Sequence, residues 1–164
     1  MPLLKRITLA LAAIALLSSF GCAPKRTGAT YDPFAIFPAT AQWAWDEGLN
    51  RLPVDQSISD LNIRAIVREV VTEGLAKRGY TMAPDGGKVD FRVHYQVGIG
   101  TKVDGTTVKG YGSLNLTLVN ATTNQEVWVG FVRTESDVSL SEDDRRKRLQ
   151  KRVDKMLREF PPSQ

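Results

Sequence analysis

The sequence predicts an α+β fold, a two-layer sandwich with two helices packed on one face of a mainly antiparallel sheet. Two segments, residues 59–78 and 141–160, carry apolar residues at the spacing of amphipathic helices. Shorter segments alternate apolar and polar residues, as half-buried strands do. Three of these follow one another with short connections, which favours an antiparallel meander. The 164 residues suffice for one domain of ordinary size.

The first two strands are expected near the start of the domain. Residues 31–33 are predicted to form a short strand that ends at the proline. Thr40–Trp45 alternates, with its two tryptophans on one face, and is predicted as the second strand. Asp46–Ser57 shows neither the helical nor the strand period of apolar residues and is expected to be a loop.

The first helix is predicted at Ser59–Arg78. Its apolar stripe comprises Ile63, Ile66, Val67, Val70, Val71 and Leu75. Ser59 is expected to cap the first turn, because its hydroxyl can accept from an unpaired amide there. Lys77 and Arg78 favour the dipole at the C-terminal end, and Gly79 supplies a left-handed stop.

Three strands are then predicted in series, at Val89–Val97, Ser113–Val119 and Glu126–Thr134. Gly98–Gly112 is rich in glycine and is expected to be the loop between the first two, with a turn signal at Asp104-Gly105. The polar face of the sheet is a candidate docking surface. Arg92, His94, Asn115 and Thr117 are expected there, while the side occupied by Trp128 stays open.

The last helix is predicted to begin at Ser141 and to end before Pro161-Pro162. Its apolar stripe comprises Leu149, Val153, Met156, Leu157 and Phe160. Four cationic residues lie opposite this stripe: Lys147, Lys151, Lys155 and Arg158. The acids at 142–144 fall in the first turn, where they favour the helix dipole and satisfy unpaired amides.

The start of the chain has the pattern of a targeting signal rather than of a folded segment. Lys5 and Arg6 form a positive region, and Ile7–Leu17 is an uncharged apolar run of eleven residues. A membrane span needs roughly 20 such residues, so an uncleaved anchor is disfavoured. Residues 1–21 are therefore predicted to be a signal peptide.

Cys22, the chain's single cysteine, follows Gly21 directly after this run. This arrangement resembles the bacterial lipobox, in which the cysteine becomes acylated and the chain is cut before it. The resemblance implies lipid attachment at Cys22, a tether at residues 22–30 and a domain at 31–164. Ala23 next to the cysteine implies sorting to the inner leaflet of the outer membrane, facing the periplasm. An ordinary secretory signal is the alternative.

Basic residues are concentrated in the last helix. Arg145–Arg158 contains eight basic residues and one acid, a net charge of +7. The plain interpretation is a solvated face opposite a core stripe. The functional interpretation is that this face contacts anionic headgroups or another envelope polyanion through Lys147, Lys151, Lys155 and Arg158. Nucleic acid is not expected, because no aromatic residues interrupt the basic run.

No catalytic or metal-binding constellation is predicted. The single histidine, His94, is four residues from Asp90 on one strand face, about 13 Å away, so the two cannot touch. Gly98–Lys102 lacks the sequence of a phosphate-binding loop. One histidine and one cysteine give no metal-ligand cluster, and no cofactor is expected.

Seven segments, in this order, carry a family resemblance over nearly all of the predicted mature chain: residues 31–33, Gln42–Trp45, Ala76–Tyr80, Val89–Tyr95, Gly112–Leu116, Asn120–Gly130 and Phe160–Pro162. They resemble the family called domain of unknown function (DUF) 4136, which comprises bacterial envelope lipoproteins. The resemblance implies the fold and an envelope location. It implies no reaction, cofactor or partner.

The expected function is accordingly that of a non-catalytic interaction or structural module, held at a membrane surface by acyl chains on Cys22. Its expected partners are the membrane itself and anionic headgroups or an envelope protein. Two alternatives remain open. A small envelope hydrolase would need ionisable groups converging in a pocket, and a carrier of an apolar ligand would need a cavity between sheet and helices.

Overall fold

The computed structural model of the chain describes residues 26–50, 62–135 and 140–160. The predictions for Cys22, for the signal peptide and for a cap at Ser59 lie outside these residues. The described elements are β1 (Thr27–Tyr31), β2 (Ala41–Trp45), α3 (Ile63–Ala76), β3 (Tyr80–Met82), β4 (Phe91–Asp104), β5 (Thr107–Asn120), β6 (Glu126–Glu135), α4 (Glu142–Met156) and the 3-10 turn η2 (Leu157–Glu159).

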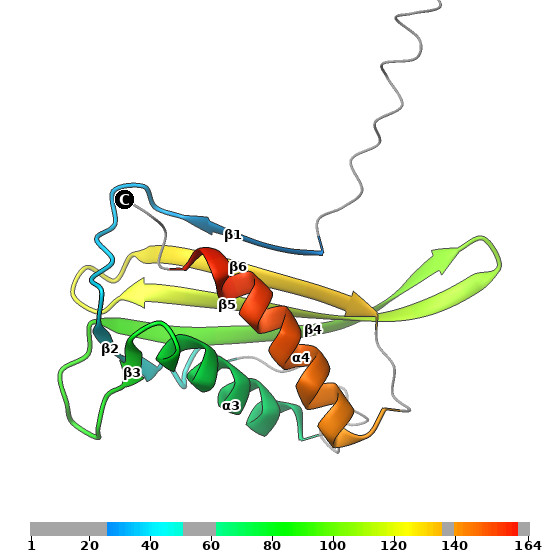
Figure 1. Ribbon diagram of the computed structural model, residues 1–164. Helices are drawn as coiled ribbons and strands as arrows, with labels where there is room; N and C mark the ends of the chain where they lie inside the picture. Colours follow the sequence, from blue (N-terminus) through cyan, green and yellow to red (C-terminus); the bar gives the residue numbers. More distant parts are fainter. Residues whose placement is uncertain (1–25, 51–61, 136–139, 161–164) are drawn as a thin grey trace, which may run out of the picture.

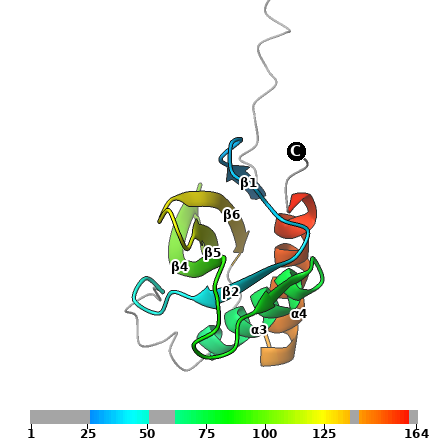
Figure 2. The same cartoon turned by 90° about the vertical axis from the view of Figure 1, so that its left-hand side faces the viewer.

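The six strands form one mixed sheet in the order β1-β6-β5-β4-β2-β3. β1, β6, β5 and β4 pair antiparallel, whereas β2 runs parallel to both β4 and β3. The α+β class is confirmed, but the mainly antiparallel sheet holds for four strands only. The difference arises because β2, α3 and β3 form a crossover unit, in which the helix returns the chain to the same end of the sheet. Both helices lie in front of the sheet in Figure 1 and side by side in Figure 2.

The two edge strands differ from expectation. β3 is not among the predicted strands, because three residues show no period. β1 begins at Thr27, so residues 27–30, expected in the tether, belong to the sheet. Thr27, Thr30 and Tyr31 favour a strand, but Gly28, Ala29 and the short length of β1 weaken the local signal. Its position is set by pairing with β6, where the ring of Phe131 lies 2.8 Å from the place of a Cβ on Gly28.

The glycine-rich segment Gly98–Gly112 is strand rather than loop, which corrects the prediction. β4 and β5 pair continuously from Phe91 opposite Asn120 to Asp104 opposite Thr107. The predicted turn at Asp104-Gly105 is confirmed, with φ +60° at Gly105. Pairing outweighs the low strand propensity of glycine here. In Figure 1 the tip of this hairpin extends beyond the end of β6.

The start and end residues of the two helices can be compared with the prediction wherever the structure describes them. Gly79 has φ +83°, so the left-handed stop after α3 is confirmed. Asn62, with φ 50°, precedes α3, which starts later than predicted. α4 begins where predicted, and the Ser141 hydroxyl caps it by accepting from the Asp144 amide at 3.1 Å. The helix ends at Met156 and continues as one 3-10 turn.

The core lies between the sheet and the two helices. Trp43, Tyr80 and Trp128 are completely or almost completely buried in it. The rings of Tyr80 and Trp128 contact that of Phe160, at centroid distances of 4.9 and 5.2 Å. Trp128 therefore lies on the core face of the sheet, which settles the side that the sequence left open.

Candidate functional site

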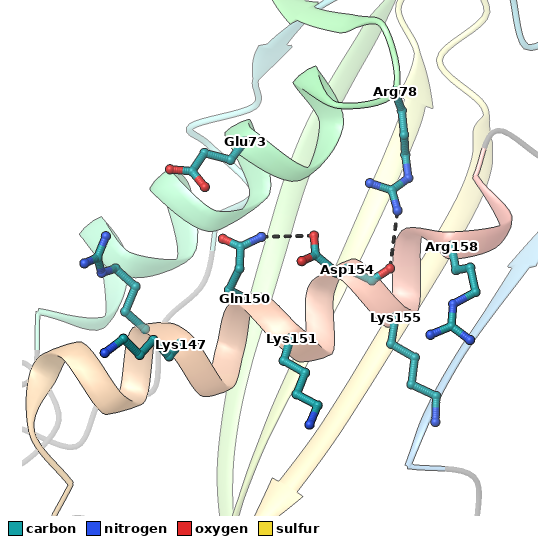
Figure 3. Close-up of a pocket in the computed structure, with 9 residues that line it drawn as sticks. Glu73, Arg78, Lys147, Gln150, Lys151, Asp154, Lys155 and Arg158 are labelled. Carbon is teal, nitrogen blue, oxygen red and sulfur yellow. Dashed lines mark hydrogen bonds between the residues drawn. The ribbon is translucent and has the colours of Figure 1, made fainter.

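A shallow hollow lies on the surface of the α3–α4 pair that faces away from the sheet (Figure 3). All four cationic residues predicted as a contact surface line it. The complete lining comprises Glu73, Arg78, Arg146, Lys147, Gln150, Lys151, Asp154, Lys155 and Arg158. With six cations against two carboxylates, this surface attracts anions.

Two of these cations already have acidic partners. Lys147 Nζ lies 2.6 Å from Asp143 Oδ2, and Arg146 contacts both Asp143, at 3.1 Å, and Glu69, at 2.9 Å. The hydrogen bond from Lys147 holds the pKa of the Asp143 carboxyl below its usual value, with a second contribution from Arg146. Arg146 joins α4 to α3 through Glu69, so it stabilises the helix pair as well as carrying charge, whereas the pair of Lys147 and Asp143 lies within α4.

Three of the other cations are available to bind an external anion. Lys151, Lys155 and Arg158 are exposed and make no ion pair or hydrogen bond to any other residue that the structure describes. In Figure 3 their side chains extend from α4 and η2 on the side away from α3. Long side chains in this position can reach an external anionic group while their stems cover the helix surface.

Arg78 is a part of this surface whose sequence position predicts only an interaction with the dipole of α3. Its guanidinium donates to the Gly74 carbonyl at 2.7 Å, to the Asp154 carbonyl at 3.3 Å and to the Leu157 carbonyl. Burial lowers the pKa of Arg78, although a guanidinium remains charged at any physiological pH. One side chain thus satisfies the C-terminal carbonyls of both helices. The sequence signal was an arginine just before a left-handed glycine, but its second partner is distant in the chain.

The basic end of α4 lies close to the start of the domain. Met156 packs against Gly130 of β6, with its sulfur 2.8 Å from where a Cβ on that glycine would lie. Gly130 pairs with Ala29 of β1, seven residues after Cys22. Seven residues span at most about 25 Å. A lipid anchor on Cys22 would therefore hold a bilayer within reach of this end of α4.

The polar sheet face brings only part of the second predicted surface together. His94 pairs with Thr117, and Asn115 lies opposite Gln96 on the same face. Thr117 is buried rather than solvated. Arg92 is bound to Asn124 and lies 3.6 Å from Asp46. The burial of Thr117 and the partners of Arg92 reduce the free polar surface of this face, whereas Asn115 remains exposed as predicted.

The residues considered for catalysis lie apart or have structural partners. Asp90 accepts from the Gln42 amide at 2.9 Å and faces Lys88, so it orients the β2–β4 junction. The acids at 142–144 occupy the first turn of α4, as predicted. Within the described ranges, no three histidine, cysteine or acidic residues are grouped to hold a metal ion. None of the helices described is both long and apolar enough to cross a bilayer.

Comparison with known proteins gives one family match and several likenesses of fold. The model of the family described as "Domain of unknown function (DUF4136)" matches residues 28–162. No curated protein matches the chain. Solved structures with a similar fold include a PDZ domain protein from Parabacteroides distasonis, at 10% identity and a TM-score of 0.55. The match covers 85% of this chain but only 36% of that protein.

The PelC dodecamer from Paraburkholderia phytofirmans is similar over most of both chains. Its identity is 11% and its TM-score 0.51, with 80% of this chain and 94% of the PelC chain covered. At such low identities both likenesses concern the fold alone.

Proposed function

The chain belongs to the DUF4136 family, and on this basis we propose that it is a bacterial envelope lipoprotein anchored through an acylated Cys22. Its folded domain acts as a non-catalytic interaction module at the membrane surface. The cations Lys151, Lys155 and Arg158 face anionic lipid headgroups, with Lys147 at the edge of the same surface.

One observation carries this proposal: the free cations lie at the end of α4 that packs over β6 and β1. β1 is also the strand nearest to Cys22 in the chain, since it begins at Thr27. The closeness of Cys22 to β1 in the chain supports contact of these cations with the membrane that would carry the anchor. A juxtamembrane Lys or Arg contributes about 1 kcal/mol near an anionic surface. Three such residues add orientation to an attachment that acyl chains already make stable.

The proposed location is the inner leaflet of the outer membrane, with the domain in the periplasm. It rests on the resemblance of Gly21-Cys22-Ala23 to the lipobox and to its sorting rule. The proposed processing removes residues 1–21 and leaves a mature chain that starts at Cys22.

Neither alternative function gains support from a specific contact. A carrier would need space between sheet and helices, where Trp43, Tyr80 and Trp128 pack instead. A hydrolase would need converging acid and base groups, whereas the hollow on α3 and α4 is lined mainly by cations. The interaction module is therefore the function that the surface favours.

The Cys22→Ser variant tests the anchor. We expect the wild-type chain to sediment with membranes and to resist extraction by high salt, because its acyl chains hold it. The variant should not acquire acyl chains and should lose the salt-resistant, lipid-mediated attachment. Metabolic labelling with a palmitate analogue measures acylation directly. Equal labelling of both chains would contradict the assignment of Cys22.

A further inference from the structure

The connection between β1 and β2 exposes the most solvent-accessible large apolar side chains among the described residues. Phe34 is 91% exposed and Ile36 is 77% exposed, and Tyr31 beside them is 50% exposed. Large apolar side chains grouped in this way on a soluble surface mark a site of interaction. We call these three residues the β1 loop patch.

The patch is held in place by hydrogen bonds and by a buried ring. The Asp32 carboxylate accepts from the Phe34 amide at 2.9 Å, and the Asp32 amide donates to the Val127 carbonyl of β6 at 3.0 Å. Further along the loop, Phe37 is buried against Phe91 and Phe160. The loop therefore has fixed ends and a bonded turn, and it presents Phe34 and Ile36 outward.

The chain before the patch indicates what covers it. Only Ala23–Lys25 separate Cys22 from the first described residue, and Arg26 is already fixed to β6, since its carbonyl accepts from the Arg133 amide at 2.7 Å. β1 then runs along the edge of the sheet to Tyr31. Figure 1 shows the chain entering β1 at one end and leaving towards β2 at the other. An acylated Cys22 would attach to its bilayer only a few residues before this short edge, and the patch follows the edge directly.

Charge at the same edge fits a lipid surface. The contact between Phe37 and Phe160 places the loop next to η2, which carries Arg158. Arg158 and Lys155 have no partner among the described residues. Aromatic and aliphatic side chains flanked by cations are typical of segments that enter the boundary between headgroups and acyl chains.

We infer that the β1 loop patch inserts into the bilayer that carries the chain's own anchor, with Phe34 and Ile36 below the headgroups and Arg158 and Lys155 at the phosphates. This inference rests on the proposed acylation of Cys22. The anchor, the patch and the α4 cations then form three contacts, which fix the orientation of the domain with the β1 edge towards the membrane.

The test uses the full acylated chain in vesicles of phosphatidylethanolamine and phosphatidylglycerol. Because acylation blocks the only natural cysteine, a Phe34→Cys substitution gives one thiol for an environment-sensitive fluorophore. Met82→Cys is the matched control, since Met82 is 54% exposed and lies on β3, the opposite edge of the sheet. We expect nitroxide-labelled lipid to quench the label at position 34 and aqueous iodide to quench the label at 82.

A second variant measures the contribution of the neighbouring side chain. Adding Ile36→Ser to the labelled chain should lower the ratio of inserted to water-exposed label about tenfold, because burial of an aliphatic side chain is lost. Circular dichroism of each labelled chain verifies that it is folded.

The outcomes distinguish failure of the proposed anchor at Cys22 from failure of the inferred insertion of the β1 loop patch. If the protein floats with the vesicles while iodide quenches position 34 as strongly as position 82, the inference is wrong and the anchor stands. A label at 34 that neither quencher reaches is covered by protein, which also overturns insertion into lipid. If Cys22 carries no acyl chains and the protein does not float, the proposed function fails and the inference falls with it.

Discussion

Arg78 joins the ends of two helices that are about 80 residues apart in the chain. Its hydrogen bonds to carbonyls of Gly74, Asp154 and Leu157 are made by a charged donor, and such bonds are stronger than neutral ones. We expect Arg78→Ala to lower the free energy of unfolding by about 2 kcal/mol, because the carbonyls lose their partner. Urea unfolding followed by circular dichroism measures the change.

Lys77 provides the control for this prediction. Its side chain is 56% exposed and lies 3.8 Å from Asp154. An exposed ion pair contributes little, so Lys77→Ala should cost less than about 1 kcal/mol. Equal losses for the two variants would show that Arg78 acts only as a surface charge.

Gly130 is required by a close approach in the core rather than by a turn. A Cβ there would lie 2.1 Å from the Trp128 ring and 2.8 Å from Met156. Gly130→Ala should therefore destabilise the fold by about 1–3 kcal/mol through overpacking. Gly112→Ala is the matched control in β5, because the nearest atom to its Cβ is 3.9 Å away. A stable Gly130→Ala variant would mean that α4 does not pack this closely on β6.

Tyr80 makes the free energy of unfolding depend on pH in the alkaline range. Burial raises the pKa of its phenol to about 12, from 10.0. Between these values the unfolded chain loses the Tyr80 proton and the folded chain keeps it. Stability is therefore fully present below pH 10 and falls as the pH rises towards 12, by up to about 1.4 kcal/mol per pH unit. Tyr80→Phe should remove this share of the slope, and an unchanged slope in urea unfolding would contradict the burial.

Helix α4 is the element that we expect to contact anionic lipid. Replacing Lys151, Lys155 and Arg158 by Gln should weaken binding of the acyl-free chain, starting at Ala23, to phosphatidylglycerol vesicles. A loss of about 1 kcal/mol for each residue corresponds to roughly a hundredfold change in affinity. Because these side chains have no partners in the described part of the chain, the midpoint of urea unfolding should stay nearly constant.

A charge-matched control distinguishes a local contact from net charge. Arg64, Lys77 and Lys88 lie outside the free end of α4, and changing them to Gln removes the same number of positive charges. Co-sedimentation should show a much smaller effect for this control. Similar losses for both triple variants would mean that overall charge, and not the α4 surface, determines binding.

The elements that the sequence predicted well are those with a strong local period. The core stripe of α3 and the alternation in β4, β5 and β6 are found as expected, because burial of one face imposes the period. β3, residues 27–30 of β1 and the outer part of the β4–β5 hairpin were missed. In each, short length or glycine weakens the local signal, and pairing with a distant strand decides the structure.

In the candidate site, too, local patterns could be predicted from the sequence and long-range contacts could not. The cationic side of α4 was predicted from its spacing, since charges opposite an apolar stripe must face outward. The contacts of Arg78, the ion pairs of Arg146 and the exposure of Phe34 could not be predicted. Their environment depends on residues that are remote in the chain, including those of β6 and η2 that hold the loop after β1 in place.

At the scale of the whole molecule, the described domain combines a mixed sheet, a helix pair and one edge that leads back towards Cys22. The cations on α4 and the apolar residues after β1 lie at this edge. If Cys22 is acylated as proposed, the position of this single thiol determines which side of the domain meets the membrane.

The intact mass of the mature protein, extracted from membranes with detergent, tests the proposed acylation most directly. We predict a chain that starts at Cys22, lacks residues 1–21 and carries the additional mass of acyl chains on its first residue. An unmodified chain, or one that retains its first 21 residues, would contradict the proposal.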